Sequence, residues 1–179
     1  MDLTQWLSER KESVVGTWFA AALETYPSET QTFLTTQKDQ FHNPVGHTLR
    51  EGLEAIFDEL LGSADFDKIA PVLDSIIKIR ALQEVPPSHA VAFVFDLKGV
   101  IRRELRPADR TPRTPEELEA FDTKIDDLAL RAFDLYMKCR ERLCEIRSNE
   151  VRNMTAKLVE RANDIFERYC KESREQKQP

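Results

Sequence analysis

Apolar residues recur at every third or fourth position over most of the chain, which is the spacing of amphipathic α-helices. The first such segment covers residues 2–26, and a short second one begins at Ser28, where Ser28 and Gln31 fit a capping box. Pro27 separates the two segments, because a proline ring cannot continue a helix. The pattern therefore predicts one long helix followed by one short helix.

Two further helices are predicted in the middle of the chain. The third begins at Pro44, a residue suited to the first helical position, and ends at Gly62 as a C′ glycine. The fourth covers residues 65–83, with Pro71 early enough in the helix to be tolerated.

The most apolar run of the sequence is Ala90 to Phe95, which follows two prolines and Ser88. Its valines and phenylalanines would also suit a β-strand. We predict a helix that continues to about residue 103, because Ser88 can cap it, no partner strand is evident and the helical spacing continues. A helix that is apolar on nearly all sides belongs at the centre of a core.

A last helical segment follows a connector rich in proline and arginine, with Thr114 as its cap and Pro115 at its first position. Its apolar residues have heptad-like spacing, which predicts a seam against a second copy of the chain. The seam residues are Leu118, Phe121, Ile125, Leu128, Leu135 and Ile146. A second phase begins at Val151, which leaves open a register shift inside one helix or a break into two.

Length, charge and cysteine content narrow the protein class. The 179 residues suffice for one domain with a core. The net charge of -6 argues against non-specific nucleic-acid binding, which depends on neutralising phosphates. No apolar window long enough for a membrane-inserted helix is present. Three cysteines without a CxxC motif fit a reducing compartment, so we expect a cytoplasmic protein.

One candidate ligand site lies beside the apolar run. His89 opens the most apolar helix, so it is the first choice as an axial haem ligand. A slot between the Trp18 face of the first helix and the Phe93 face of the fifth would hold haem or another small molecule. This is our alternative function, a haem or small-molecule carrier. The favoured interpretation gives these residues ordinary core and helix-end roles.

No catalytic or metal-binding constellation is evident. His42 and His47 lack the spacing of a helical metal pair, and Glu141 and Glu145 lack the ExxH partner of a di-iron helix. The basic residues around the apolar run are expected to be solvated helix ends: Lys78, Arg80, Lys98, Arg102 and Arg103. We therefore expect no metal, no cofactor and no enzymatic activity.

Three segments resemble, in this order, the N-terminal domain of RsbRD-type stressosome proteins, a domain also found ahead of sensor histidine kinases. They are FHNPVGHTLREGLEAIFDELL, LDSIIKIRALQEVPPSHAVAFVFDLKGVIR and FDTKIDDLALRAFDLYMKCRERLCEIRSNEV. The NPVG turn and the IRALQ segment are the most specific parts, and the resemblance covers Leu3 to Val151. It implies a globin-like, dimeric domain without bound haem.

The resemblance implies a signal-sensing or regulatory module that acts through protein–protein contacts in bacterial stress or sensory signalling. Longer relatives continue into a STAS or kinase domain, for which the residues before Pro179 leave no room, so we expect a free-standing homodimer that contacts an unknown regulatory protein. The expected fold is all-α, a globin-like bundle with a long C-terminal helix. We expect a sensory domain over residues 1–150, a helical extension over 151–172 and a disordered tail over 173–179.

Overall fold

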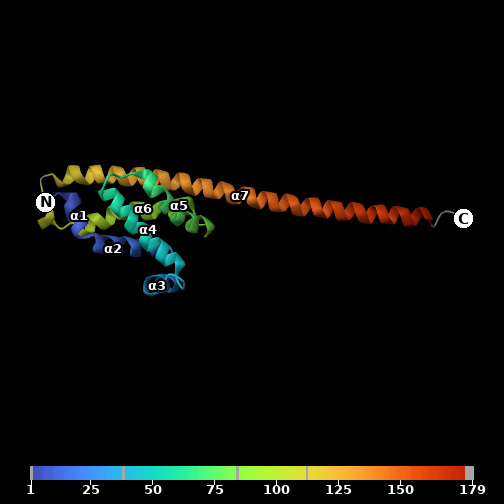
Figure 1. The fold of residues 1–179 in the computed structure, drawn as a ribbon, viewed down its shortest axis with the longest axis horizontal. Coiled ribbons are helices and arrows are strands. Elements are labelled where there is room, and N and C mark those ends of the chain that lie inside the picture. The colour runs from blue at the N-terminus through green and yellow to red at the C-terminus, as the bar shows by residue number, and fades with distance from the viewer. Residues whose placement is uncertain (1, 38, 84, 112, 176–179) are drawn as a thin grey trace. The chain divides into compact units, whose positions relative to one another are not determined.

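The computed structural model describes residues 2–37, 39–83, 85–111 and 113–175, with side chains described up to residue 168. These residues form seven α-helices and one 3₁₀ helix, with no strand among them, which confirms the all-α prediction (Figure 1). The chain divides into two compact units, unit 1 over Met1–Cys139 and unit 2 over Arg140–Pro179, and each is described by itself.

The helices follow one another with short connections. They are α1 (Leu3–Glu9), α2 (Lys11–Leu23), α3 (Ser28–Thr36), α4 (Pro44–Leu61), α5 (Phe66–Leu82), α6 (Pro87–Glu104), the 3₁₀ helix η1 (Pro107–Asp109) and α7 (Thr114–Glu175). Within unit 1, α2 packs on α4 and α6, and α5 packs on the same two helices, so these four surround one hydrophobic core.

The predicted first helix is in fact two helices that meet at Arg10. The backbone of Arg10 leaves the helical region, and its N–H donates to the Leu7 carbonyl at 3.2 Å. Its guanidinium lies over the Trp6 ring, 4.6 Å from the ring centroid. The break changes the direction of the chain, and both Trp6 and Trp18 are buried in the same core.

Two predicted caps are wrong because prolines occupy the positions before the helices. Pro27 and Pro86 are the N-cap residues of α3 and α6, and both have extended backbone conformations. Ser28 and Ser88 therefore lie inside the helices, and neither helix has a side-chain cap bond. Each proline fixes the chain in an extended conformation at the helix entry but supplies no side-chain acceptor for the first-turn N–H groups.

The predicted start of α4 and its end before Gly62 are confirmed, whereas the left-handed C′ role predicted for Gly62 is wrong. Pro44 occupies the first turn, and the Asn43 side chain accepts the Gly46 N–H at 2.8 Å. Gly62 has a φ of -87°, so it does not provide the left-handed C′ conformation. The left-handed residue is Ala64, with a φ of 52°.

The helix α7 is continuous to Glu175, so the change of apolar phase occurs inside one helix and not at a break. The predicted end near residue 172 falls short of the observed one, and residues 176–179 lie outside the described part of the chain. Thr114 does not cap α7, because its hydroxyl accepts the Thr111 N–H at 2.7 Å. The Glu117 N–H bonds instead to the Arg113 carbonyl.

Within unit 1, α7 is fixed to three other parts of the fold by hydrogen bonds. The Glu117 carboxylate accepts the Leu3 N–H at 3.1 Å at the start of α1. The Lys124 ammonium donates to the Leu60 carbonyl at 2.8 Å at the end of α4. Further along, the Tyr136 hydroxyl donates to the Val85 carbonyl at 2.6 Å, between α5 and α6. This part of α7 therefore belongs to the domain.

The helix α6 is largely buried, as the apolar run predicted, and the rejection of a β-strand is confirmed. Ala90, Phe93, Val94 and Leu97 are fully buried in the core. One side of α6 nevertheless faces solvent, because Phe95 is 46% exposed. The globin-like arrangement implied by the resemblance stays a prediction.

Candidate functional site

Two of the three candidate ligand residues are direct packing partners. The Trp18 indole N–H donates to the Phe93 carbonyl at 2.6 Å, and the two rings stack with centroids 6.5 Å apart. Both side chains are fully buried, so their own atoms occupy the space between α2 and α6. The His89 side chain is exposed. The structure brings Trp18 and Phe93 together as core residues and does not bring His89 to them.

A buried arginine lies next to this pair, which corrects the expectation that Arg80 is a solvated helix end. Arg80 is only 1% exposed. Its Nη2 donates to the Ala22 carbonyl at 2.7 Å, and its guanidinium lies 4.8 Å from the centroid of the Phe93 ring. The Ala22 carbonyl is in the last turn of α2, where carbonyls lack helical partners and the helix dipole attracts a cation. Arg80 thus caps the C-terminal end of α2.

Burial shifts the pKa values of Arg80 and of the neighbouring Asp96 carboxyl. Burial lowers the pKa of the Arg80 guanidinium, and its Nε has no hydrogen-bond partner among the described residues. Burial raises the pKa of the neighbouring Asp96 carboxyl, and Glu24 acts in the same direction. Backbone carbonyls and aromatic rings are the groups that contact Arg80, so we assign it a structural role.

Three of the other basic residues form surface ion pairs, as expected of solvated helix positions. The pairs are Lys78 with Asp74 at 2.5 Å, Lys98 with Asp126 at 2.6 Å, and Arg102 with Asp122. Two of these pairs connect α6 to α7 within unit 1.

The predicted seam is wrong as a surface for a second copy, because most of it packs inside the same chain. Phe121, Ile125 and Leu128 are buried in the core of unit 1. Leu118 and Leu135 are half-buried and pack against that core. The remaining seam residue, Ile146 in unit 2, is 47% exposed. The heptad-like spacing up to Leu135 therefore marks an intramolecular contact.

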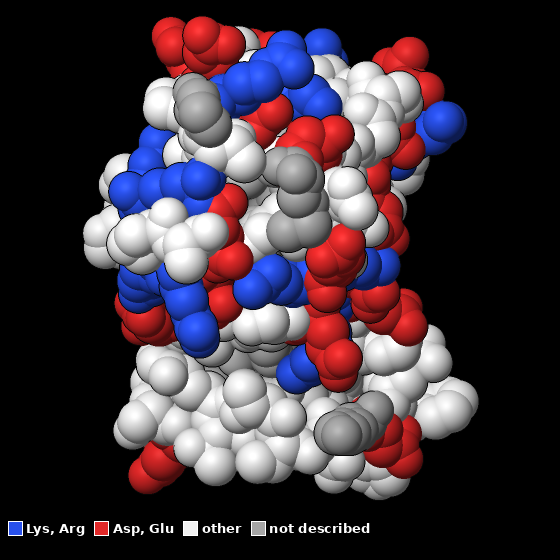
Figure 2. Space-filling model, turned by 90° about the vertical axis from the view of Figure 1, so that its left-hand side faces the viewer, with Lys and Arg blue, Asp and Glu red and all other residues white. Residues whose placement is uncertain are grey.

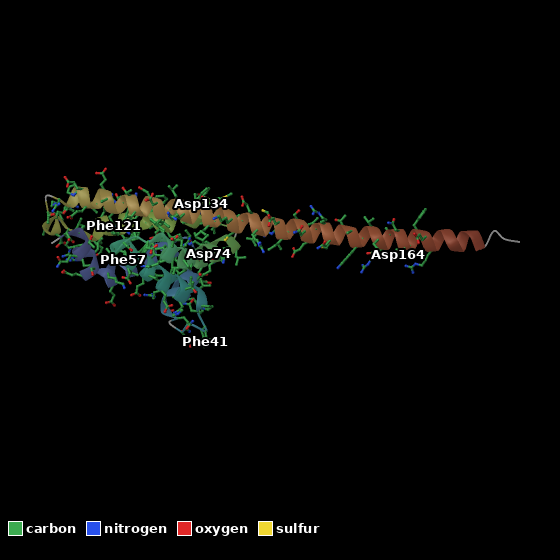
Figure 3. The ribbon with its side chains drawn as sticks, turned by 45° about the horizontal axis from the view of Figure 1, so that its top comes forward. Phe41, Phe57, Asp74, Phe121, Asp134 and Asp164 are labelled. Carbon is green, nitrogen blue, oxygen red and sulfur yellow. The ribbon has the colours of Figure 1, made fainter. Side chains whose placement is uncertain are left out.

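A second apolar stripe lies in unit 2 and is exposed. Val151, Leu158 and Ile165 are spaced by seven residues and are 63–64% exposed, and we call them the unit 2 stripe. Large apolar residues beside the stripe are also exposed: Met154, Val159 and Phe166. Every described side chain from residue 144 to 168 is exposed, including Asp164 (Figure 3). This stretch of helix lacks a core of its own.

Arginines follow one edge of the unit 2 stripe. Arg147 lies four residues before Val151, and Arg161 and Arg168 each lie three residues after a stripe residue. Residues three and four apart are neighbours on a helix surface, so these arginines border the stripe. An apolar seam with charged edges is typical of helices that pair with other helices.

The other two histidines pair with nearby carboxylates. His42 pairs with Asp39 at 3.0 Å, and His47 pairs with Glu51 at 3.1 Å. Among the described residues, no three His, Cys, Asp or Glu side chains gather so that they could hold a metal ion. No helix in the described part of the chain combines the length and apolar character needed to cross a membrane.

Comparison with known protein families shows what the chain is similar to. The family model described as "RsbT co-antagonist protein rsbRD N-terminal domain" matches residues 12–151. Searches of curated proteins and of solved structures gave no match. The matched residues include nearly all of unit 1 and the first part of unit 2.

Proposed function

This chain belongs to the family of RsbRD N-terminal domains, and we propose on that basis that it is a cytoplasmic regulatory module that acts by contacting other proteins. The family suggests a role in stress signalling, and its description names a co-antagonist. We propose a non-enzymatic role without a cofactor, in which the chain conveys a signal through non-covalent contacts. The proposal includes no role in binding nucleic acid.

We further propose that the chain forms a homodimer through the unit 2 stripe. The observation that carries this proposal is the exposure of Val151, Leu158 and Ile165 at seven-residue spacing. Burying one such side chain contributes about 1.5–3 kcal/mol. In folded proteins most of the stability of a helix comes from the packing of its apolar face. A second copy of the same stripe supplies that packing.

Light scattering on the full chain tests this proposal. We expect the wild type to be a dimer at micromolar concentration and the double variant Leu158→Glu, Ile165→Glu to be a monomer, because a charge in a helix seam opposes pairing. Leu130→Glu is the matched control, since Leu130 is equally exposed but lies in unit 1. A monomeric wild type, or a double variant that stays dimeric, would contradict the proposed homodimer.

A further inference from the structure

The unit 2 stripe has a second uncharged row beside it on α7. Its members are Ser148, Thr155 and Ala162, which we call the small row, and all three are exposed. Each of them lies three residues before a member of the unit 2 stripe. Spacings of three and four residues alternate along the two rows, which is the pattern of a and d positions in a coiled coil. The small row occupies the a positions and the unit 2 stripe occupies the d positions.

The uncharged rows begin at Ser148. Continued toward unit 1 in the same register, the a positions are occupied by Glu141 and Asp134. A carboxylate at an a position would lie between two paired helices, where an unpaired charge is costly. Residues 148–168 therefore form the part of α7 that is suited to pairing, and we call it the unit 2 seam.

Residues at the two edges of the unit 2 seam decide the direction of pairing, because e and g positions contact the partner helix. The g edge consists of the stripe-bordering arginines and one methionine: Arg147, Met154, Arg161 and Arg168. The e edge within the seam consists of Arg152, Val159 and Phe166. Three of these edge residues are large and apolar, and they are 55–68% exposed: Met154, Val159 and Phe166.

A parallel, in-register pair gives each of these apolar edge residues a suitable neighbour. In that arrangement a g residue meets the e residue five positions later in the second copy. Met154 then meets Val159, which buries apolar surface on both sides. Arg161 meets the ring of Phe166, an arrangement that permits a cation–π contact. One pair is unfavourable, because Arg147 meets an arginine at position 152.

An antiparallel pair with the same two rows in contact matches the edges poorly. In that direction g positions meet g positions and e positions meet e positions. Val159 then lies opposite Arg152, so its apolar side chain has a charged neighbour. Arg147 lies opposite Arg168, so a like-charge pair is present in this direction as well. The parallel direction is the one that matches apolar edge residues with each other.

The surface of unit 1 is a poorer cover for the unit 2 seam than a second seam is. Most of the face of unit 1 in Figure 2 carries lysine and arginine beside aspartate and glutamate. Contact with that area would take charged side chains out of water without giving the unit 2 stripe an apolar partner. The unit 2 seam of a second copy is free of charge along both rows.

We propose that two copies of the chain pair along the unit 2 seam as a parallel, in-register coiled coil. The inference rests on the proposed homodimer, and it specifies the direction and the register in which the two stripes meet. Each stripe residue then packs against its own counterpart in the second copy. The match of Met154 with Val159 across the edges carries the direction.

Two charge reversals form a matched test of direction. Arg152→Glu replaces the one like-charge contact of the parallel pair with an opposite-charge contact to Arg147, and it does so twice in a dimer. We expect the dissociation constant of the dimer to fall about three-fold or more. Arg168→Glu is the control, because Arg168 meets an arginine only in the antiparallel pair. Sedimentation equilibrium measures both constants, and tightening by Arg168→Glu alone would overturn the parallel direction.

Spin-label distances test direction and register together. The three native cysteines are replaced by alanine, and labels are attached at Ile146→Cys or Glu167→Cys. Both positions are exposed f positions, on the outer side of the paired helices, and they lie 21 residues apart. That separation corresponds to ~32 Å along a helix axis. Light scattering first establishes that the labelled chains are dimers.

The three labelled samples give opposite patterns for the two directions. For the parallel seam we expect about 20 Å within each single-site dimer, since two helices lie side by side, and more than ~30 Å between positions 146 and 167 in a mixed sample. The reverse pattern would overturn the parallel seam and leave the homodimer intact, because position 146 faces position 167 in the antiparallel pair. Long distances in all samples of a dimeric protein would overturn pairing along this seam. A monomeric protein would overturn the proposed homodimer itself.

Discussion

The two parts of α7 have the same kind of apolar spacing and opposite surroundings. In unit 1, Ile125 and Leu128 are buried in the domain core. In unit 2, Val151 and Leu158 are mostly exposed. Periodic apolar residues indicate that a helix face needs cover, but they do not indicate whether the same chain or another one provides it. The comparison can be tested by making the same substitution in both parts.

Leucine-to-alanine substitution should give the largest difference. Leu128→Ala leaves a cavity in a closed core, so we expect the free energy of unfolding of unit 1 to fall by about 2–5 kcal/mol. Leu158→Ala lies in unit 2, outside that core, and we expect it to change the free energy of unfolding of unit 1 by no more than about 0.5 kcal/mol. Urea titration followed by tryptophan fluorescence measures unit 1 alone, because both tryptophans lie there. Equal losses of unfolding free energy for the two variants would contradict the claim that Leu128 lies in the core of unit 1 and Leu158 lies outside it.

Arginine substitution should give the next largest difference. Arg80→Met leaves the Ala22 carbonyl without its donor inside the core, which costs about 1–3 kcal/mol. Arg161→Met, in the exposed part of α7, should change the free energy of unfolding by no more than about 0.5 kcal/mol. Arg80→Lys should also destabilise the fold, since an ammonium cannot reproduce the planar fork of a guanidinium. Full stability of Arg80→Lys would contradict the assigned role of this fork.

Thiol labelling should give the smallest difference and leaves stability unchanged. Burial raises the pKa of the half-buried Cys139 thiol, whereas Cys144, five residues later in unit 2, is exposed. A raised pKa means less thiolate at a given pH, and the thiolate is the reactive form. In a Cys170→Ser background, we expect Cys144 to react faster at pH 8 and Cys139 to gain reactivity only at higher pH. Faster labelling of Cys139 would place the boundary of the packed domain elsewhere.

The sequence predicted the helices of unit 1 and their order, because apolar periodicity and proline positions determine both. It did not predict the two proline N-caps at Pro27 and Pro86, since capping rules favour the serines that follow them. The break at Arg10 was also missed, although residues 8–13 are all polar and the apolar spacing resumes only at Val14.

The role of Arg80 could not be derived from the pattern alone. Arg80 occurs on the same helix face as Leu73, Ile76 and Ile77, which was a signal of burial. Its charge nevertheless favoured a solvated position. What decides the matter is a carbonyl at Ala22, 58 residues earlier in the sequence, and only the folded chain brings the two together. The predicted seam of α7 was misassigned for the same reason, because only the folded chain shows that most of its residues pack in the core of unit 1.

The bonds that fix α7 to unit 1 set an order for folding during synthesis. The Glu117 carboxylate binds the Leu3 N–H at the start of α1, 114 residues earlier in the sequence. The Lys124 ammonium binds the Leu60 carbonyl at the end of α4, 64 residues earlier. A chain still on the ribosome lacks both contacts until those residues have emerged, although every helix from α1 to α6 has already been made. Unit 1 therefore completes its fold late in translation. Until α7 has emerged, the helices made earlier keep exposed the apolar faces that α7 later covers.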